Sequence, residues 1–337
     1  MNSNEEWLLT NKEEALEPDL PICDPHHHLW DFNKTYIEET YLLPDILKDT
    51  NSGHNIVSTV FIECGAMYNK NHSIEEQVIN ETEFVNGIAA MSNSGLYGKT
   101  KIAAGIVGSA PLLIGEKVAE ILDKHLNIAP KRFKGIRSQA AMHPDGTIPS
   151  TRARPKEGVY INDMFHRGFA QLESRNLSFE AWCYHPQLPQ LIKLAKKFSN
   201  TTIILNHFGG PLGIGSFKGK EEETYSFWEK EITELSKCDN VVAKLGGIAM
   251  EINGFEWHKN KIAPSGNELI NKTKRYYEKT LELFGTDRCM FESNFPVDKI
   301  SCSYVNLWNG FKLLTKDYSA NERAKLFHDN ATRIYKL

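Results

Sequence analysis

The sequence contains eight short apolar runs rich in β-branched residues, and helix-period segments lie between most of them. The runs span 21–26, 56–63, 101–108, 132–138, 177–184, 201–207, 240–246 and 287–293. Several are almost continuously apolar, which is typical of parallel strands that are covered on both faces. Eight such units predict a (β/α)8 TIM barrel. A doubly wound sheet is the alternative, because the order of strands in a sheet cannot be read from one sequence.

Apolar residues recur at helical spacing in the segments between and after these runs. The predicted helices span 74–91, 188–198, 303–315 and 319–329. We interpret their apolar stripes as core packing. No Gly-x-Gly-x-x-Gly follows a strand, so a dinucleotide-binding fold gains no support. No shift in composition marks a second domain, and we expect one domain over residues 1–337 with an N-terminal arm at 1–19.

Four of the connections are long, and each follows the carboxyl end of a predicted strand. They come after the first, fourth, sixth and seventh strands and span 29–55, 138–160, 208–225 and 247–264. In a barrel these ends meet on one face, where the active sites of barrel enzymes are built. We therefore expect the four loops to form a lid or a substrate pocket.

Charge and cysteine usage exclude several classes of protein. The formal net charge of −4 gives no reason to expect a nucleic acid or a membrane surface as partner. No apolar run approaches the roughly 18 residues that span a bilayer, and the acidic first residues lack the apolar core of an export signal. The six cysteines contain no Cys-x-x-Cys pair. We expect reduced, mostly buried thiols in a cytoplasmic protein.

The stretch CDPHHHLWDF places three histidines in a row at the end of the first predicted strand. Because side chains alternate along a strand, we expect His26 and His28 to share one face with Asp24, and His27 to face the other way. Two converging imidazoles can bind a divalent metal or, when neutral, polarise a carbonyl group. The alternative is that these histidines cap the strand end through bonds to the backbone.

Polar and ionisable side chains also collect at the ends of other predicted strands. They are Arg137 after the fourth strand, His207 after the sixth, and Glu292, Asn294 and Asp298 after the eighth. In a barrel, the carboxyl ends of these strands share one face with the end of the first strand. This distribution is what an active site in a barrel requires.

His-x-His after the first strand, NHFGGP after the sixth and FESNFPVD after the eighth resemble the amidohydrolase-related family. The resemblance is to its branch of metal-dependent TIM-barrel hydrolases, which includes sugar lactonases and 2-pyrone-4,6-dicarboxylate lactonase, and it spans nearly the whole chain. It implies a barrel that hydrolyses a lactone, ester or amide. It also implies that His26, His28 and His207 are the histidines of the site and that Arg137 binds a substrate carboxylate.

The eighth-strand motif departs from the family pattern Ser-Asp-Trp-Pro, because residues 293–296 read SNFP and place Asn294 at the aspartate position. An amide cannot take a proton from water near neutral pH. Three interpretations stay open: the base is now Asp298 or Glu292, Asn294 only orients the water or the substrate, or hydrolysis is lost. We favour Asp298 because a loop residue can reach into the pocket. Asp298 can instead cap the next helix, near Cys302, and Glu292 can pair with a cation.

The family includes members that hold a divalent ion and members that hydrolyse lactones without one, so both chemistries stay open. With a metal, such as zinc or manganese, the resemblance implies that His26, His28 and His207 are ligands and that a carboxylate completes the set. His185 can replace the lost anionic ligand unless it is bonded to nearby backbone. Without a metal, the histidines and Arg137 polarise the carbonyl group.

Further residues near the strand ends are candidates for contact with the substrate. Trp30, Tyr184 and His185 are expected at the pocket, where an aromatic wall suits a ring-shaped substrate. Trp182 also flanks a strand end. Lys244 lies in an apolar strand and needs a partner, so we expect it to contact the substrate or to pair with a carboxylate such as that of Glu63.

The function that we expect is a cytoplasmic hydrolase of a small lactone or cyclic amide that carries a carboxylate. Water attacks a carbonyl group that the histidines, or a metal held by them, polarise, and Asp298 or Glu292 takes the proton. The alternatives are a metal-dependent decarboxylase of a small aromatic acid and a small-molecule binding protein on the same scaffold. A homodimer stays open as the assembly.

Overall fold

The computed structural model describes residues 3–31, 40–151 and 154–337, and it confirms the predicted barrel. Eight parallel strands form one sheet in sequence order. They are β1 (Pro21–His27), β4 (Asn55–Ile62), β5 (Lys101–Ser109), β6 (Phe133–Arg137), β7 (Ser178–Ala181), β8 (Ile203–Leu205), β9 (Val241–Leu245) and β10 (Cys289–Phe291). Each of them overlaps a predicted strand. The sequential order excludes the doubly wound alternative, in which the strand order reverses within the sheet.

The barrel closes where its first and last strands meet. The backbone N–H of His28 donates to the carbonyl oxygen of Phe295 at 2.8 Å, and the N–H of Asn294 donates to the carbonyl oxygen of His26 at 2.9 Å. An isolated parallel bridge joins His27 to Phe295. These bonds hold the two motifs that carry the histidines and Glu292 against each other.

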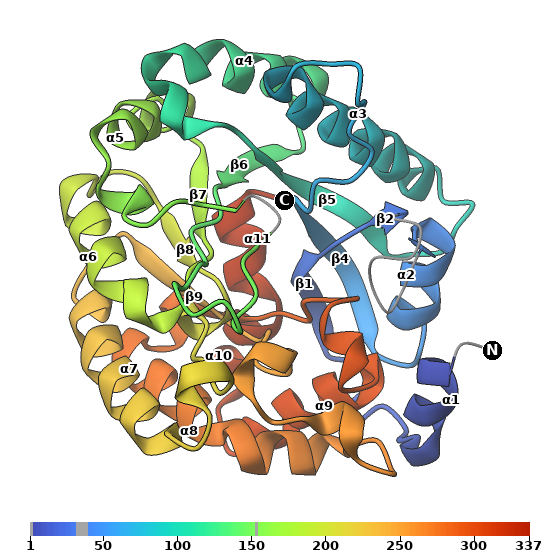
Figure 1. Cartoon of the computed structure of the whole chain (residues 1–337). Coiled ribbons are helices and arrows are strands. Elements are labelled where there is room, and N and C mark those ends of the chain that lie inside the picture. The colour runs from blue at the N-terminus through green and yellow to red at the C-terminus, as the bar shows by residue number, and fades with distance from the viewer. Residues whose placement is uncertain (1–2, 32–39, 152–153) are drawn as a thin grey trace.

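Helices surround the strands on the outside of the barrel (Figure 1). They are α2 (Leu43–Thr50), α3 (Ile74–Asn93), α4 (Val118–Ile128), α5 (Asp163–Phe169), α6 (Leu188–Lys197), α7 (Glu221–Ser236), α8 (Gly266–Phe284) and α9 (Tyr304–Leu314). The start of α8 is fixed by a capping box, since Ser265 and Glu268 each accept the backbone N–H of the other. None of the helices in the described part of the chain combines the length and the apolar character of a membrane span.

The last predicted helix, 319–329, extends further than its periodicity indicated. It consists of α10 (Ala320–Ala324), a π-helical turn (Lys325–Asp329) and α11 (Asn330–Tyr335). Ala331 and Tyr335 pack against inward-facing strand residues such as Ile204 and Val242, and α11 lies at the centre of the ring in Figure 1. This packing joins elements that are far apart in the chain, so local periodicity does not reveal it.

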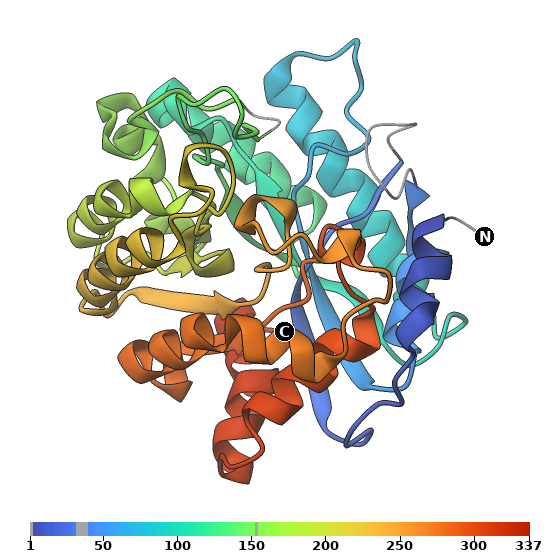
Figure 2. The same ribbon diagram turned by 60° about the horizontal axis from the view of Figure 1, so that its bottom comes forward.

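Long loops follow β1, β6, β8 and β9, as predicted, and those after β6, β8 and β9 gather over one end of the barrel (Figure 2). A small antiparallel pair, β2 (Trp30–Asp31) and β3 (Thr40–Tyr41), belongs to the first loop. The N-terminal residues begin with α1 (Ser3–Leu8) and then contact α9, where the backbone N–H of Leu16 donates to the side chain of Asn309 at 2.8 Å.

Candidate active site

Three histidines lie together at the carboxyl end of the barrel. The ring of His26, near the end of β1, lies 4.5 Å from the ring of His207 and 5.0 Å from the ring of His28, measured between centroids. His27 faces away, and its Nε2 lies 2.9 Å from the hydroxyl oxygen of Thr59. The expectation that His26 and His28 share a face and that His207 joins them is therefore confirmed. All three imidazoles are buried, and no more than 3% of any of them is exposed.

Asp24 does not share that face, so this expectation was wrong. Its carboxylate accepts the backbone N–H and the hydroxyl of Ser293 at 3.0 and 2.6 Å, and the hydroxyl of Tyr304 at 3.0 Å. The pairing register of β1 with β4 shifts between Asp24 and His27. A bulge of this kind breaks the alternation of side chains on which the expectation rested.

A carboxylate lies between two of the imidazoles: that of Glu292, the residue directly after β10. Nδ1 of His207 donates to Oε1 of Glu292 at 2.7 Å. Its Oε2 lies 2.7 Å from Nδ1 of His26, but the two atoms lack the alignment of a hydrogen bond. Among the described residues Oε2 has no hydrogen-bond partner, although it is completely buried. Burial raises the pKa of Glu292 from 4.5 to about 8. Such an oxygen is suited to accept a proton or to bind a cation.

The donor atoms of His26, His207 and Glu292 lie within 4.8 Å of one another, which is close enough to hold one metal ion. Burial lowers the pKa of both histidines well below 6.5, so their imidazoles are neutral, the form that ligates metals. The predicted set is three histidines completed by a carboxylate, and the geometric set contains Glu292 as that carboxylate but does not include His28. Nδ1 of His28 donates to the carbonyl oxygen of Ile62 at 2.8 Å, which leaves Nε2 as an acceptor.

Two buried ion pairs flank the cluster. Nε of Arg137 lies 2.6 Å from the carboxylate of Glu63, and Nζ of Lys244 lies 3.0 Å from the carboxylate of Glu180. Both cations also reach His26, because Nη1 of Arg137 lies 3.4 Å from Nε2 and Nζ of Lys244 lies 3.3 Å from Nδ1. The partner of Lys244 is thus Glu180 and not Glu63, because Glu63 forms its ion pair with Arg137.

These pairs leave one carboxylate in excess around the cluster. Lys244 lies 4.0 Å from Glu292, but its ammonium is already shared with Glu180 and with the carbonyl oxygen of Pro25, at 2.8 Å. Within the part of the chain that the structure describes, two cations therefore face three carboxylates. A buried charge without a partner is unstable, so Glu292 either takes up a proton or binds a cation. The donor set, its free oxygen and this charge balance fit a divalent ion.

Asp298 is also buried, but both of its carboxylate oxygens are engaged. Oδ1 accepts the side-chain amide of Asn294 at 2.7 Å, and Oδ2 accepts the backbone N–H of Ala249 at 3.1 Å. Burial raises the pKa of Asp298 to about 8. Asp298 does not cap the next helix, because Ser303 is the N-cap of α9. Of the two carboxylates that we considered as the base, Glu292 is the one with a free oxygen.

Two tryptophans pack directly on the histidines. The indole of Trp30 stacks on the ring of His28 at 5.8 Å with an angle of 17° between the planes. Trp182 meets the ring of His207 edge-on at 4.8 Å. Aromatic packing of this kind fixes the orientation of an imidazole.

Tyr184 and His185 lie farther from the cluster. The hydroxyl of Tyr184 donates to the carbonyl oxygen of Pro149 at 2.5 Å, and Nδ1 of His185 accepts the backbone N–H of Leu212 at 3.2 Å. His185 therefore has the backbone bond that we had considered as its alternative to metal ligation, and it is not part of the geometric metal set.

Three residues that support the histidine cluster are not among the candidates that the sequence indicates: Glu180, Gly247 and Tyr335. Glu180 accepts the hydroxyl of Tyr335 and the side-chain amide of Asn206, in addition to Lys244. Gly247 has a φ of +66°, and a Cβ atom there would lie 1.9 Å from Nδ1 of His207. A charged residue inside the apolar run 177–184 was a visible signal for Glu180. The contact with Tyr335 has no local signal, because Tyr335 lies 155 residues after Glu180 in the chain.

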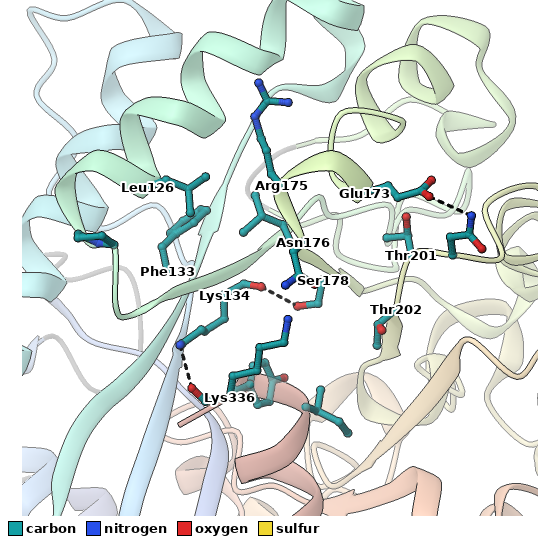
Figure 3. Close-up of a pocket in the computed structure, with 15 residues that line it drawn as sticks. Leu126, Phe133, Lys134, Glu173, Arg175, Asn176, Ser178, Thr201, Thr202 and Lys336 are labelled. Carbon is teal, nitrogen blue, oxygen red and sulfur yellow. Dashed lines mark hydrogen bonds between the residues drawn. The ribbon is translucent and has the colours of Figure 1, made fainter.

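A pocket of about 470 Å³ lies at the mouth of the barrel. Trp30 lines this pocket and also stacks on the ring of His28. Its other lining residues belong to the loops after β6, β8, β9 and β10. A smaller pocket, of about 240 Å³, lies at the opposite end of the barrel, between the amino ends of β6 and β7 and the last residues of the chain (Figure 3). There, Nζ of Lys134 donates to the carbonyl oxygen of Lys336. None of the histidines of the cluster lines the smaller pocket.

A comparison with family models agrees with this geometry. The family described as amidohydrolase matches residues 23–337. The chain belongs to the amidohydrolase family. The family match, together with the relatives named as lactonases, shows that this amidohydrolase is a hydrolase.

Among its relatives, the amidohydrolase is 32% identical to the protein y4mH of Sinorhizobium fredii, over 95% of this chain and 99% of y4mH. It is 26% identical to an L-fucono-1,5-lactonase of Burkholderia multivorans, over 53% of this chain and 58% of the lactonase. A solved amidohydrolase of Burkholderia multivorans is 21% identical, covers 94% of this chain and 99% of its own, and superimposes with a TM-score of 0.70 in its HEPES-bound crystal form and 0.68 in its zinc-bound form. The solved structures thus share the fold.

Proposed function

We propose that this amidohydrolase opens the ring of a small cyclic ester. The observation that carries the proposal is the carboxylate of Glu292, which lies between the neutral imidazoles of His26 and His207 and whose Oε2 has no hydrogen-bond partner among the described residues. The L-fucono-1,5-lactonase named among its relatives acts on this class of bond, which supports the same chemistry here.

In the proposed reaction, water attacks the carbonyl carbon, the ring C–O bond breaks and a hydroxy acid leaves. Oε2 of Glu292 accepts the proton that the water loses and returns it to the ring oxygen, which leaves as a hydroxyl group. The carboxylic acid that forms then ionises and releases a proton to solvent. Nε2 of His28 accepts a hydrogen bond from the water and orients it. Arg137 and Lys244 each lie within 3.4 Å of a nitrogen of His26 and hold its imidazole in place, so that the ring can polarise the carbonyl group.

A second arrangement of the same residues includes one divalent cation, zinc or manganese, held by His26, His207 and Glu292. Such an ion supplies Lewis-acid polarisation of the carbonyl group and a more acidic water. The excess carboxylate charge supports this arrangement, and so does the zinc bound to the solved relative. Because the ion would occupy Oε2 of Glu292, the two arrangements exclude each other at that atom.

The remaining predicted contacts stay predictions. Trp30 has the strongest support as a substrate contact, because it lines the pocket. The guanidinium of Arg137 and the ammonium of Lys244 are engaged with protein carboxylates, so we propose that they position His26. Tyr184 and His185 keep the role of substrate contacts only as a prediction, as do the cytoplasmic location and the homodimer.

Kinetics of two matched variants test the role of Glu292. With a panel of lactones and proton release as readout, we expect the kcat of Glu292→Gln to fall by roughly 10²–10⁴-fold, the usual contribution of a positioned acid or base. Asp298→Asn serves as the control, and we expect it to keep more than a tenth of the wild-type kcat. A wild-type kcat in Glu292→Gln would contradict the proposal. Release of CO2 in place of a proton would favour the decarboxylase alternative.

Elemental analysis of protein purified without a histidine tag separates the two arrangements. The metal arrangement predicts about one equivalent of zinc or manganese in the wild type and a loss of that metal in Glu292→Gln. The metal-free arrangement predicts full activity in protein that has been freed of metal with a chelator.

A further inference from the structure

The pocket at the barrel mouth differs in chemistry from the ion-paired cluster beside it. Eight of its lining residues are apolar: Trp30, Pro149, Ile214, Met250, Ile252, Pro296, Val297 and Ile300. They come from the loops after β1, β6, β8, β9 and β10, so five different parts of the chain contribute an apolar wall. A volume of about 470 Å³ is within the range of small-molecule sites.

The four polar residues of the pocket lie on the loop after β9 and are paired with each other. Nε2 of His258 lies 3.5 Å from the carboxylate of Glu251, and Nζ of Lys259 lies 2.5 Å from the carboxylate of Glu256. The charge of Lys259 is offset by Glu256, and Glu251 adds a negative charge to the pocket wall. Among the residues that the structure describes, the pocket wall gathers no positive charge that would hold a carboxylate, and its polar groups lie on one loop rather than around the pocket, as a polyhydroxylated ring would need.

A satellite apolar cluster supports the wall from behind. Ile252 packs in it with Trp182, while Ile214 and Met250 pack against it and remain half-buried at the pocket surface. Trp182 is the residue that meets His207 edge-on, and Trp30 stacks on His28. Trp30 therefore joins the apolar pocket to His28, whereas the histidines and Glu292 do not line the pocket themselves. The pocket is thus placed to hold a part of the ligand other than the reacting carbonyl group.

We propose that this pocket binds an apolar substituent, an alkyl chain or an aryl ring, on the cyclic ester, and that the enzyme prefers such lactones to polyhydroxylated sugar lactones. The inference rests on the proposed function for its catalytic part. Ile214, Met250 and Ile252 are then specificity-determining residues. Water still attacks the carbonyl carbon, and the substituent stays on the hydroxy acid that leaves.

A homologous series tests the inference. γ-Butyrolactone and its 4-methyl, 4-ethyl, 4-propyl and 4-butyl derivatives are compared with D-galactono-1,4-lactone, which has the same ring size. We expect kcat/KM to rise about fourfold for each added methylene, the value for burial of one CH2 group, and to be at least about 100-fold lower for the galactonolactone than for the butyl lactone. A kcat/KM that does not change with chain length, or that is highest for the galactonolactone, would overturn the inference.

Two methionine variants of the same chemistry provide the matched comparison. Met250→Gln makes the pocket wall polar at nearly constant size, and we expect the dependence of kcat/KM on chain length to fall to about half of its wild-type slope. Met164→Gln makes the same change at an exposed position of α5 outside the pocket, where 41% of the residue is exposed, and the wild-type slope should persist. Equal slopes in both variants would contradict the assignment of Met250.

A binding measurement separates failure of this inference from failure of the proposed function. Cyclopentanone and its 2-alkyl derivatives keep the ring and the carbonyl group but cannot be hydrolysed. If no lactone releases a proton but the Kd of the ketones falls with chain length in calorimetry, the proposed function fails and the apolar pocket stands. If lactones are hydrolysed and the Kd does not change with chain length, the proposed function stands and the pocket assignment fails.

Discussion

Lys244 is the cation whose removal should affect both the stability and the catalytic cluster of this amidohydrolase. Its side chain is completely buried, and its ammonium contacts Glu180, the carbonyl oxygen of Pro25 and Nδ1 of His26. Lys244→Met keeps most of the volume of the side chain and removes the charge. The carboxylate of Glu180 then stays buried with hydrogen-bond donors but without its cation.

The cost of leaving one partner of a buried ion pair uncompensated is about 3–5 kcal/mol. The entropy of unfolding is about 2.1 cal/mol/K per residue, which amounts to about 0.7 kcal/mol/K for 337 residues. Lys244→Met should therefore lower the Tm by about 4–7 °C in scanning calorimetry. As a control, Lys237→Met removes a lysine that is 61% exposed and lies 2.5 Å from Glu234, which is 43% exposed. A surface pair contributes about 0–1 kcal/mol, so the Tm should change by less than about 1.5 °C.

A double-mutant cycle identifies the cause of the loss. If the loss arises from the uncompensated carboxylate, combining Lys244→Met with Glu180→Gln should give a protein that is more stable, by about 1–3 kcal/mol, than the sum of the two single effects predicts. Additive losses, or a Tm of Lys244→Met within 1.5 °C of the wild type, would refute the reasoning. The charge of Lys244 would then not be needed to stabilise the buried carboxylate of Glu180.

Three further changes test separate parts of the structure. Gly247→Ala places a Cβ atom 1.9 Å from Nδ1 of His207, so the imidazole must move, and we expect kcat/KM to fall about 100-fold while the circular dichroism spectrum is unchanged. Tyr335→Phe removes the hydroxyl that donates to Glu180, and the loss of about 1–3 kcal/mol should lower the Tm by about 1–4 °C. Burial raises the pKa of Asp298 from 3.8 to about 8, so the folded state binds more protons than the unfolded state between these values, and stability is lost as the pH rises from about 4 to about 8. Asp298→Asn removes this dependence, so the wild type should lose stability relative to the variant between pH 5 and pH 8 in denaturant unfolding; parallel curves would show that Asp298 does not titrate in this way.

The barrel could be predicted from the sequence because its strands are buried on both faces. Such strands read as continuous apolar runs, for example 201–207 and 240–246, and eight of them in regular alternation with helices leave few architectures. The positions of His26, His28 and His207 followed from the same argument, since each lies at the carboxyl end of a strand. The geometry that strand order imposes was therefore sufficient to place the imidazoles together.

The ion pairs could not be predicted in the same way. Lys244 and Glu180 lie on β9 and β7, which are not neighbours in the sheet, and they meet across the interior of the barrel. Which inward-facing side chains meet there depends on the stagger and tilt of the strands, and a single sequence does not give these quantities. The same limit explains the error at Asp24, because a one-residue bulge in β1 reverses the faces of the residues that precede it.

The choice between Glu292 and Asp298 as the base depends on which carboxylate oxygens the fold already engages. A loop can bring Asp298 into the pocket, yet both of its oxygens accept hydrogen bonds, from the side chain of Asn294 and from the loop after β9. Glu292 is fixed at a strand end, where its position is set by the barrel rather than by a loop. The loss of the family aspartate at Asn294 therefore need not remove a carboxylate from the cluster. The residue two positions earlier supplies one, and Asp298 holds the amide that stands in the place of the aspartate.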